Sequence, residues 1–250
     1  MDARARNGVT RDGQNVAHVH DRLRAAILRG ELPAGQITSQ VTLARELHIG
    51  RTPLREALRM LQREGLIVGE PNRRVRIAEL SSADAEELYV MRIALEAVAI
   101  RMTVPTLTSP DFAELEGLMA QMDHYMRSDD RPGLRVPHRA FHDRLVRAAG
   151  ERVTITIGQL FDHAERYRLA YGATTRDRWE QRRAEHREIL DAAAAGDGEL
   201  AAERLVAHYV QTVRFIFAAL DPAHDLARLR ATIRTVAPGA EHSLTGEPLA

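Results

Sequence analysis

Apolar residues recur every three or four positions along most of this chain, the spacing that places them on one face of a helix. Two short apolar runs, 66–68 and 75–77, instead suggest strands. The fold class is therefore mainly α. Helices are predicted over residues 16–29, 42–47, part of 49–67, 83–104, 109–127, 134–149, 153–171, 176–195, 197–219 and, as a shorter one, part of 221–236.

A change of organisation is expected near residues 81–84, Ser-Ser-Ala-Asp, which are typical of a helix start. A chain of 250 residues with 44% apolar residues is large enough for two domains. Four segments are predicted along the chain. They are a flexible arm over 1–15, a winged helix-turn-helix domain with a small two-stranded wing over 16–78, an all-helical domain over 83–220, and a short helix with a loose tail over 221–250, the tail starting at Pro238. The C-terminal helices are expected to form an antiparallel bundle of six or seven.

The composition excludes several classes of protein. Cysteine is absent, which rules out disulfides and thiolate chemistry. There is no long uncharged apolar stretch, and residues 1–15 lack the apolar segment of a signal peptide. We therefore expect a cytoplasmic protein without a membrane partner.

The formal net charge of zero conceals two halves of opposite sign. Residues 1–78 hold 14 arginines and 8 acidic residues, a balance of +6, and residues 79–250 hold 21 arginines and 27 acidic residues, a balance of −6. A basic first domain and an acidic second domain suit a protein that places one end on a polyanion. All basic residues are arginine, so arginine counts alone carry little weight.

The strongest motif is a short helix over 42–47, a turn over 48–50 and a longer basic helix that starts near Arg51. Pro53 suits the first turn of that helix, where its missing N–H is no loss. Leucines supply its apolar stripe, and Arg51, Arg55, Arg59 and Arg63 lie on the other side. This order of elements is the helix-turn-helix arrangement, whose second helix enters the major groove of double-stranded DNA.

The same residues resemble the winged helix of GntR-type transcriptional regulators. The resemblance spans about 16–78 and rests on Ile27 to Gly35, on Gly-Arg-Thr-Pro-Leu-Arg-Glu-Ala-Leu at 50–58, and on Glu-Gly-Leu-Ile at 64–67. It implies that Arg51, Thr52 and Arg55 contact bases and phosphates of an operator.

Further DNA contacts are expected from Gln40, Arg59, Arg73 and Arg74. Two of these positions depart from the family pattern. Gln40-Val41 stands where some relatives carry Glu-Arg, which removes one possible contact. Arg74 stands where the wing tip usually has glycine, so either the turn differs or the wing gains a basic contact.

Four histidines are spaced suggestively in the helical half. His138 and His142 lie four residues apart and so share one helix face, while His186 and His208 lie in two other predicted helices. Three helices of a bundle can direct imidazoles at one interior point, which is a common way to build a metal site. Several neutral imidazoles favour Zn²⁺, Ni²⁺ or a similar transition metal over Mg²⁺ or Ca²⁺.

This half resembles the helical effector domain of FadR-like GntR regulators, known as the FCD type, over about 83–220. Many members hold a divalent metal with an acid and three histidines, and His142, His186 and His208 match those histidines. His138 stands where the acid is usual, so either it is a fourth ligand or it turns away. We expect a bound divalent metal, with Zn²⁺ first and Ni²⁺ or another transition metal as alternatives.

The resemblance also implies that the metal accepts the carboxylate of a small organic acid. Arg92 could bind that carboxylate in a bidentate manner, with a salt bridge to Glu96 as the alternative, and Arg139 could line the same cavity. The resulting hypothesis is a ligand-responsive repressor that binds a palindromic operator as a homodimer. The alternatives are a zinc-dependent hydrolase with Glu185 as general base and, less favoured, an architectural or RNA-binding protein.

Overall fold

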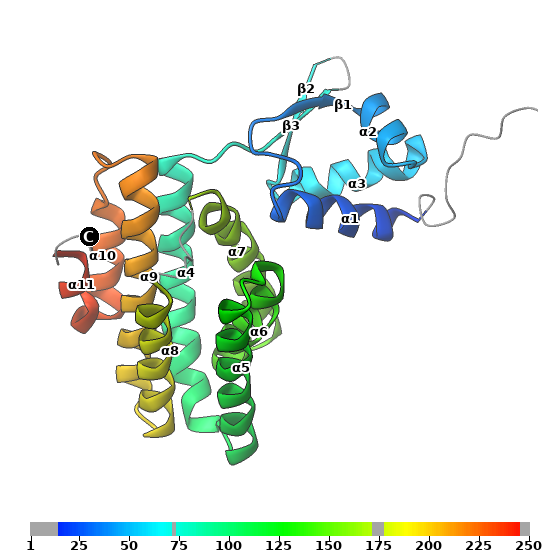
Figure 1. The fold of residues 1–250 in the computed structure, drawn as a ribbon. Coiled ribbons are helices and arrows are strands. Elements are labelled where there is room, and N and C mark those ends of the chain that lie inside the picture. The colour runs from blue at the N-terminus through cyan, green and yellow to red at the C-terminus, as the bar shows by residue number, and fades with distance from the viewer. Residues whose placement is uncertain (1–14, 72–73, 172–177, 246–250) are drawn as a thin grey trace, which may run out of the picture. The chain divides into compact units, whose positions relative to one another are not determined.

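A computed structural model describes residues 15–71, 74–171 and 178–245, which belong to two compact units divided between Leu80 and Ser81 (Figure 1). The predicted arm over 1–15 lies outside the described residues except for Asn15, whose side chain accepts hydrogen bonds from the first turn of the first helix. Within the described ranges, no helix is long and apolar enough to cross a membrane.

The first unit contains three helices and a small sheet, with the elements α1 (Val16–Leu28), β1 (Ile37–Ser39), α2 (Gln40–Glu46), α3 (Arg51–Arg63), β2 (Ile67–Glu70) and β3 (Arg74–Ile77). Helix α3 buries the predicted apolar stripe, because Leu54, Leu58 and Leu61 are at most 5% exposed. These leucines join Val19 and Leu23 of α1 in one hydrophobic core. The core fixes α3 with its arginine-bearing face outward.

The sheet has three antiparallel strands in the order β1-β3-β2 rather than the two strands of the predicted wing. Strand β1 pairs Ile37 with Arg76, and β2 pairs Ile67 with Ile77. The sequence did not indicate β1 because it is three residues long and its one large apolar side chain, Ile37, is 47% exposed. Its pairing with β3 is a tertiary contact that local periodicity does not report.

The second unit is a bundle of long helices: α4 (Ser82–Thr103), α5 (Ser109–Arg127), α6 (Arg131–Val146), α7 (Glu151–Ala170), α8 (Trp179–Ala194), α9 (Gly198–Leu220), α10 (Ala227–Val236) and α11 (His242–Thr245). Helix α4 is central, since it packs against α6, α7, α9 and α10 (Figure 1). Polar caps start three of these helices: the side chains of Ser81, Asp130 and Asp197 each accept a backbone N–H of the first turn. Helix α6 begins earlier than predicted because Asp130 caps it ahead of Leu134.

The expectation of a loose tail from Pro238 is wrong for residues 238–245. A 3-10 turn over Pro238–Ala240 and helix α11 both pack against α9. Gly239 N donates to Glu203 Oε1 at 3.2 Å, and Arg214 Nη1 donates to the Ser243 carbonyl at 3.1 Å. Short polar segments of this kind lack a periodic signal, so only the partners on α9 show that they are ordered. The final residues, 246–250, lie outside the described part of the chain.

Candidate functional site

The exposed face of α3 carries the first candidate site. Arg51 and Thr52 are exposed at its first turn, and the side chains of Arg55 and Arg59 are 56% and 58% exposed. Within the part of the chain that the structure describes, Arg55 and Arg59 form ion pairs with Glu56 alone, at 3.5 Å from Arg55 Nε and 3.0 Å from Arg59 Nη1. Surface pairs of this kind are weak, so these arginines can exchange Glu56 for a phosphate or a base edge.

The other predicted DNA contacts lie on different elements of the same unit. Gln40 is the first residue of α2 and is half-buried, and Arg74 is exposed at the start of β3. Arg73 lies outside the described residues. Arg76 of β3 is already held between Glu70 and Glu79, at 2.8 Å from each.

The second candidate site is a cluster of four histidines in the bundle. His138 and His142 project from α6, His186 from α8 and His208 from α9, and one ring nitrogen from each lies within 4.8 Å of those from the others. The four residues are between 1% and 7% exposed. The rings of His186 and His208 have centroids 4.6 Å apart. The structure thus brings together the four residues that the sequence singled out.

The cluster has the properties of a metal-ligand set. Among the described residues, His142 Nε2 and both ring nitrogens of His186 are buried without a hydrogen-bond partner. Buried polar atoms without partners are costly, so such atoms usually have a ligand. Burial lowers the pKa of all four imidazoles well below its ordinary value of 6.5, which keeps them neutral as metal ligands must be.

Glu185 directly, and Glu96 through the Tyr209 hydroxyl, determine which ring nitrogen carries the proton in two of the histidines. His208 Nδ1 lies 2.8 Å from Glu185 Oε2, so it donates to the carboxylate and leaves Nε2 unprotonated. The Tyr209 hydroxyl donates to Glu96 Oε2 at 2.5 Å and accepts from His142 Nδ1 at 3.1 Å. His142 Nε2 therefore also keeps its lone pair.

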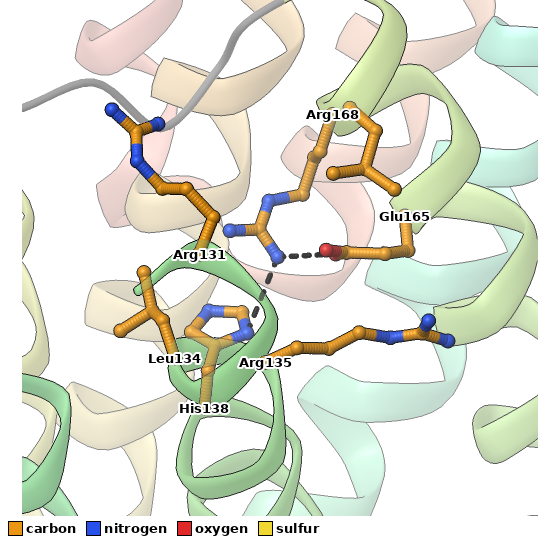
Figure 2. A pocket seen from close by; sticks show the side chains of 7 residues that line it. Arg131, Leu134, Arg135, His138, Glu165 and Arg168 are labelled. Atoms are coloured by element: carbon orange, nitrogen blue, oxygen red, sulfur yellow. Dashed lines mark hydrogen bonds and ion pairs between the residues drawn. The ribbon is translucent and has the colours of Figure 1, made fainter. Parts of the chain in front are cut away.

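His138 has a different neighbour. Its Nδ1 lies 3.2 Å from Arg168 Nη1 on α7, and the same nitrogen of Arg168 donates to Glu165 at 2.6 Å (Figure 2). None of Glu96, Tyr209, Glu165 and Arg168 was predicted as part of the site. No motif marks them, because their roles depend on which helices pack together.

Two cavities adjoin His138. One of about 90 Å³ is lined, as Figure 2 shows, by Arg131, Leu134, Arg135, His138, Glu165, Arg168 and Leu169. A smaller one of about 10 Å³, roughly the space of one water, reaches His186 and His208. His138, Arg168 and Leu134 line both cavities, so they stand between the larger cavity and the rest of the cluster.

The two arginines predicted near an effector differ in their surroundings. Arg92 is 2% exposed, and its Nε donates to Glu96 Oε1 at 2.9 Å, the salt bridge that the sequence offered as the alternative. Within the described residues its Nη2 is buried without a partner. Arg139 donates to Asp162 at 2.6 Å and to Asp143 at 3.0 Å, and it lines neither cavity.

Comparison with known proteins finds a family match for each of the two units. Residues 15–77 match the bacterial regulatory proteins of the gntR family, and residues 87–211 match the FCD domain. The chain is 34% identical over 141 residues to an uncharacterized HTH-type transcriptional regulator of Agrobacterium vitis, covering 54% of this chain and 81% of that protein. It is 29% identical over 192 residues to a probable D-xylose utilization operon transcriptional repressor of Paenarthrobacter nicotinovorans, covering 77% and 84%.

The fold is also that of a solved structure. Escherichia coli McbR/YncC superposes with a TM-score of 0.72 at 22% identity, covering 81% of this chain and 97% of that one. These relatives are regulators rather than enzymes, which sets aside the zinc-dependent hydrolase. The carboxylate of Glu185, the general base of that alternative, already accepts hydrogen bonds from His208, Arg182 and Gln181. This chain therefore belongs to the GntR family, as a DNA-binding transcriptional regulator with an N-terminal winged helix-turn-helix and a C-terminal FCD domain.

Proposed function

We propose that this regulator is a repressor that binds a palindromic operator as a homodimer and responds to a small organic acid bound at a divalent metal. The observation that carries the proposal is the convergence of four buried imidazoles inside the FCD domain, two of which, His142 and His186, have ring nitrogens without a hydrogen-bond partner among the described residues. Repression is supported by relatives that are named as repressors, including those of xylose and gluconate operons.

In this proposal α3 enters the major groove. Arg51, Thr52 and Arg55 then contact bases and phosphates near its N-terminal end, because their side chains are exposed and α3 is fixed by its buried leucines. The remaining candidates add phosphate contacts that position the domain without reading sequence; they are Gln40, Arg59, Arg73 and Arg74.

The homodimer is supported by an apolar stripe on α4. Met91, Val98 and Met102 are 47%, 52% and 50% exposed, and with Leu95 they follow a 4-3-4 spacing on one helix face. The opposite face of α4 is buried in the bundle, so apolar side chains lie on two sides of this helix. An exposed apolar stripe is typical of an interaction surface, and a second copy of this chain would bury it.

The metal is held in this proposal by His142, His186 and His208, and imidazole nitrogen suits Zn²⁺, or Ni²⁺ or another transition metal. When bound, the metal supplies a Lewis acid that accepts the effector's carboxylate. The unpartnered Nη2 of Arg92 is available to a carboxylate oxygen of the same ligand. We propose no effector contact for Arg139, because Asp143 and Asp162 already hold its guanidinium.

Effector binding would alter DNA affinity through the spacing of the two winged domains. This requires only that the acid bind one arrangement of the dimer better than another, and such coupling is typically about 1–3 kcal/mol.

Fluorescence anisotropy with the promoter DNA that flanks the gene tests the proposal. The full chain is stripped with a chelator, reloaded with Zn²⁺ and titrated with DNA, and a panel of small organic acids is then added. We expect the protein to take up one Zn²⁺ per chain and bind the DNA, and we expect one acid to change the affinity without being consumed. Failure to bind that DNA even at low salt, where phosphate contacts are strongest, would refute the proposal.

Arg55→Ala is the informative variant in the same assay. Loss of one base-reading arginine should weaken specific binding by about 1–3 kcal/mol, or about fivefold to more than 100-fold, with thermal stability unchanged. Arg63→Ala, at the opposite end of α3, is the matched control and should weaken binding far less. Equal effects of the two substitutions would remove Arg55 from the site.

A further inference from the structure

We infer that His138 is not a fourth metal ligand but a hydrogen-bond donor that selects an anionic effector, and that this effector carries two negative charges. The inference rests on the proposed metal site and assigns a role to the residue that replaces the acid of the family pattern.

The contact with Arg168 determines which ring nitrogen of His138 carries the proton. A guanidinium can only donate, so in the contact between Arg168 Nη1 and His138 Nδ1 the histidine nitrogen accepts. The neutral ring then carries its proton on Nε2. Its one lone pair is already used by Arg168, so the ring has none left for a metal.

Arg168 is held in place for this role. Its Nη1 also donates to Glu165 at 2.6 Å, and the side chains of Arg168 and Glu165 are only 15% and 8% exposed. Figure 2 shows Arg168 reaching from α7 with Glu165 on one side and His138 on the other. The buried ion pair therefore fixes the guanidinium against His138 and with it the tautomer of the ring.

The other three histidines have the opposite arrangement. Nδ1 of His142 and Nδ1 of His208 face Tyr209 and Glu185, which leaves Nε2 of each ring free to bind a metal. His186 has no hydrogen bond at either nitrogen among the described residues. Three ligands and one donor result, and three protein ligands leave a position open for an exogenous ligand.

The charged side chains beside the cluster are already paired with one another. Each buried guanidinium beside the cluster is matched by a carboxylate: Arg92 by Glu96, Arg168 by Glu165 and Arg182 by Glu185. Imidazoles supply no negative charge, so no residue of this set offsets the two positive charges of a divalent ion. Uncompensated buried charge is unfavourable, so the site should prefer a ligand that brings two negative charges. An aspartate at position 138 would have supplied one of them.

The cavities define the route of that ligand. His138 and Arg168 line both the larger cavity and the small one that reaches His186 and His208. A ligand that enters from the larger cavity passes the N–H of His138, which favours an oxyanion and disfavours a neutral donor such as an amine. The chemical class is therefore a small dicarboxylate or an equivalent dianion.

Metal affinity without any effector tests the ligand assignment. Zn²⁺ dissociation constants are measured by competition with a chromophoric chelator for the wild type, His138→Asn and His142→Asn. We expect His138→Asn to lose less than about tenfold and His142→Asn to lose more than about 100-fold. X-ray absorption of the wild-type zinc protein should count three imidazoles. A loss in His138→Asn as large as that in His142→Asn, or a count of four, would overturn the inference while leaving the metal site intact.

Anion binding tests the second half of the inference. Calorimetry on the Zn²⁺-loaded full chain compares succinate with butyrate, which has the same chain length and one charge fewer. We expect at least about tenfold tighter binding of succinate, equivalent to about 1.4 kcal/mol. His138→Asp, which restores the acid, should bind Zn²⁺ more tightly than the wild type and lose the preference for succinate.

Two results distinguish this inference from the proposed function. Equal binding of the two acids, or binding of neither, would overturn the dianion assignment even if the metal is present. A wild-type protein that takes up no stoichiometric metal would refute the proposed metal site itself. Thermal denaturation of each variant shows that it is folded.

Arg168→Met tests the tautomer assignment. Arg135→Met is its control, since Arg135 also lines the larger cavity but donates to Asp162. Only Arg168→Met should raise the imidazole count, because it frees His138 Nδ1.

Discussion

Tyr209 links the histidine cluster to the buried ion pair between Arg92 and Glu96 on α4. Its hydroxyl accepts from His142 Nδ1 and donates to Glu96, which in turn accepts from Arg92 Nε. This chain of hydrogen bonds orients His142 from behind, in the manner that outer partners orient metal ligands generally. A substitution at Tyr209 should therefore change the affinity of the proposed metal site, although Tyr209 is not itself a proposed ligand.

Tyr209→Phe is expected to weaken Zn²⁺ binding by about 10–100-fold, because His142 loses the partner that sets its tautomer. The same variant should lose about 1–3 kcal/mol of stability, since Glu96 and His142 are left with unsatisfied buried atoms. Chelator competition and urea denaturation measure the two effects. Tyr125→Phe, on α5, is the control, and an unchanged zinc affinity in Tyr209→Phe would contradict the assignment.

The buried imidazoles also predict how the metal-free protein responds to pH. Burial lowers the pKa of four imidazoles in the folded protein well below 6.5; they are His138, His142, His186 and His208. At a pH between the folded-state pKa and the unfolded-state pKa, the unfolded chain therefore binds more protons than the folded one. The stability of the metal-free protein should be fully present above about pH 6.5 and fall as the pH drops below it. Urea denaturation from pH 8 to pH 5 measures this.

A variant with His186→Leu serves as the comparison for the pH series. It has one titrating imidazole fewer, so its stability should fall less steeply over the same interval. Identical slopes for the two proteins would show that the cluster is not the source of the pH dependence.

At the scale of elements, the helix ends follow from local chemistry. Helix α1 stops at Gly30, as predicted, because that residue adopts φ +73°, a conformation that residues with a side chain rarely adopt. The starts of α4, α6 and α9 likewise follow their Ser or Asp caps. Helix boundaries could therefore be predicted to within a few residues.

Two glycine substitutions should have opposite effects on stability. Gly30→Ala should cost about 1 kcal/mol, because alanine is strained at positive φ and the structure has no neighbouring atoms that could add a clash. Gly117→Ala, inside α5 and equally free of near neighbours, should gain about 0.5–1 kcal/mol through helix propensity. Chemical denaturation measures both. A gain at Gly30 would mean that the α1 end does not require a left-handed residue.

Where element prediction failed, the missing information was long-range. Strand β1 and helix α11 are too short to show a period, and each is ordered by contacts with a distant element, β3 and α9 respectively. Arg139 was expected to line the effector cavity, and its contact with Asp162 of α7 is likewise long-range information that periodicity does not report.

At the scale of the whole molecule, the proposed dimer depends on the exposed stripe of α4. Val98→Glu places a charge in the middle of Met91, Val98 and Met102 and should weaken self-association by about 2 kcal/mol or more. Analytical ultracentrifugation should show a shift toward monomer, and operator affinity should fall with it. Val136→Glu is the control, because Val136 is 71% exposed on α6 and outside the stripe. A monomeric wild type, or equal effects of the two substitutions, would refute this interface.

The amino-acid sequence by itself determined the order and approximate ends of the long helices, the helix-turn-helix with its arginine face, the opposite charges of the two halves and the four histidines as a set. Each of these depends on residues within one or two helical turns, or on composition. Only the tertiary structure decided that Tyr209 contacts Glu96, 113 residues away, and that Arg168 contacts His138, 30 residues away. Helical periodicity indicates which side of a helix is buried but not which helix covers it. The proton positions on the imidazoles, and with them the proposed division into three ligands and one donor, therefore depend on the packing.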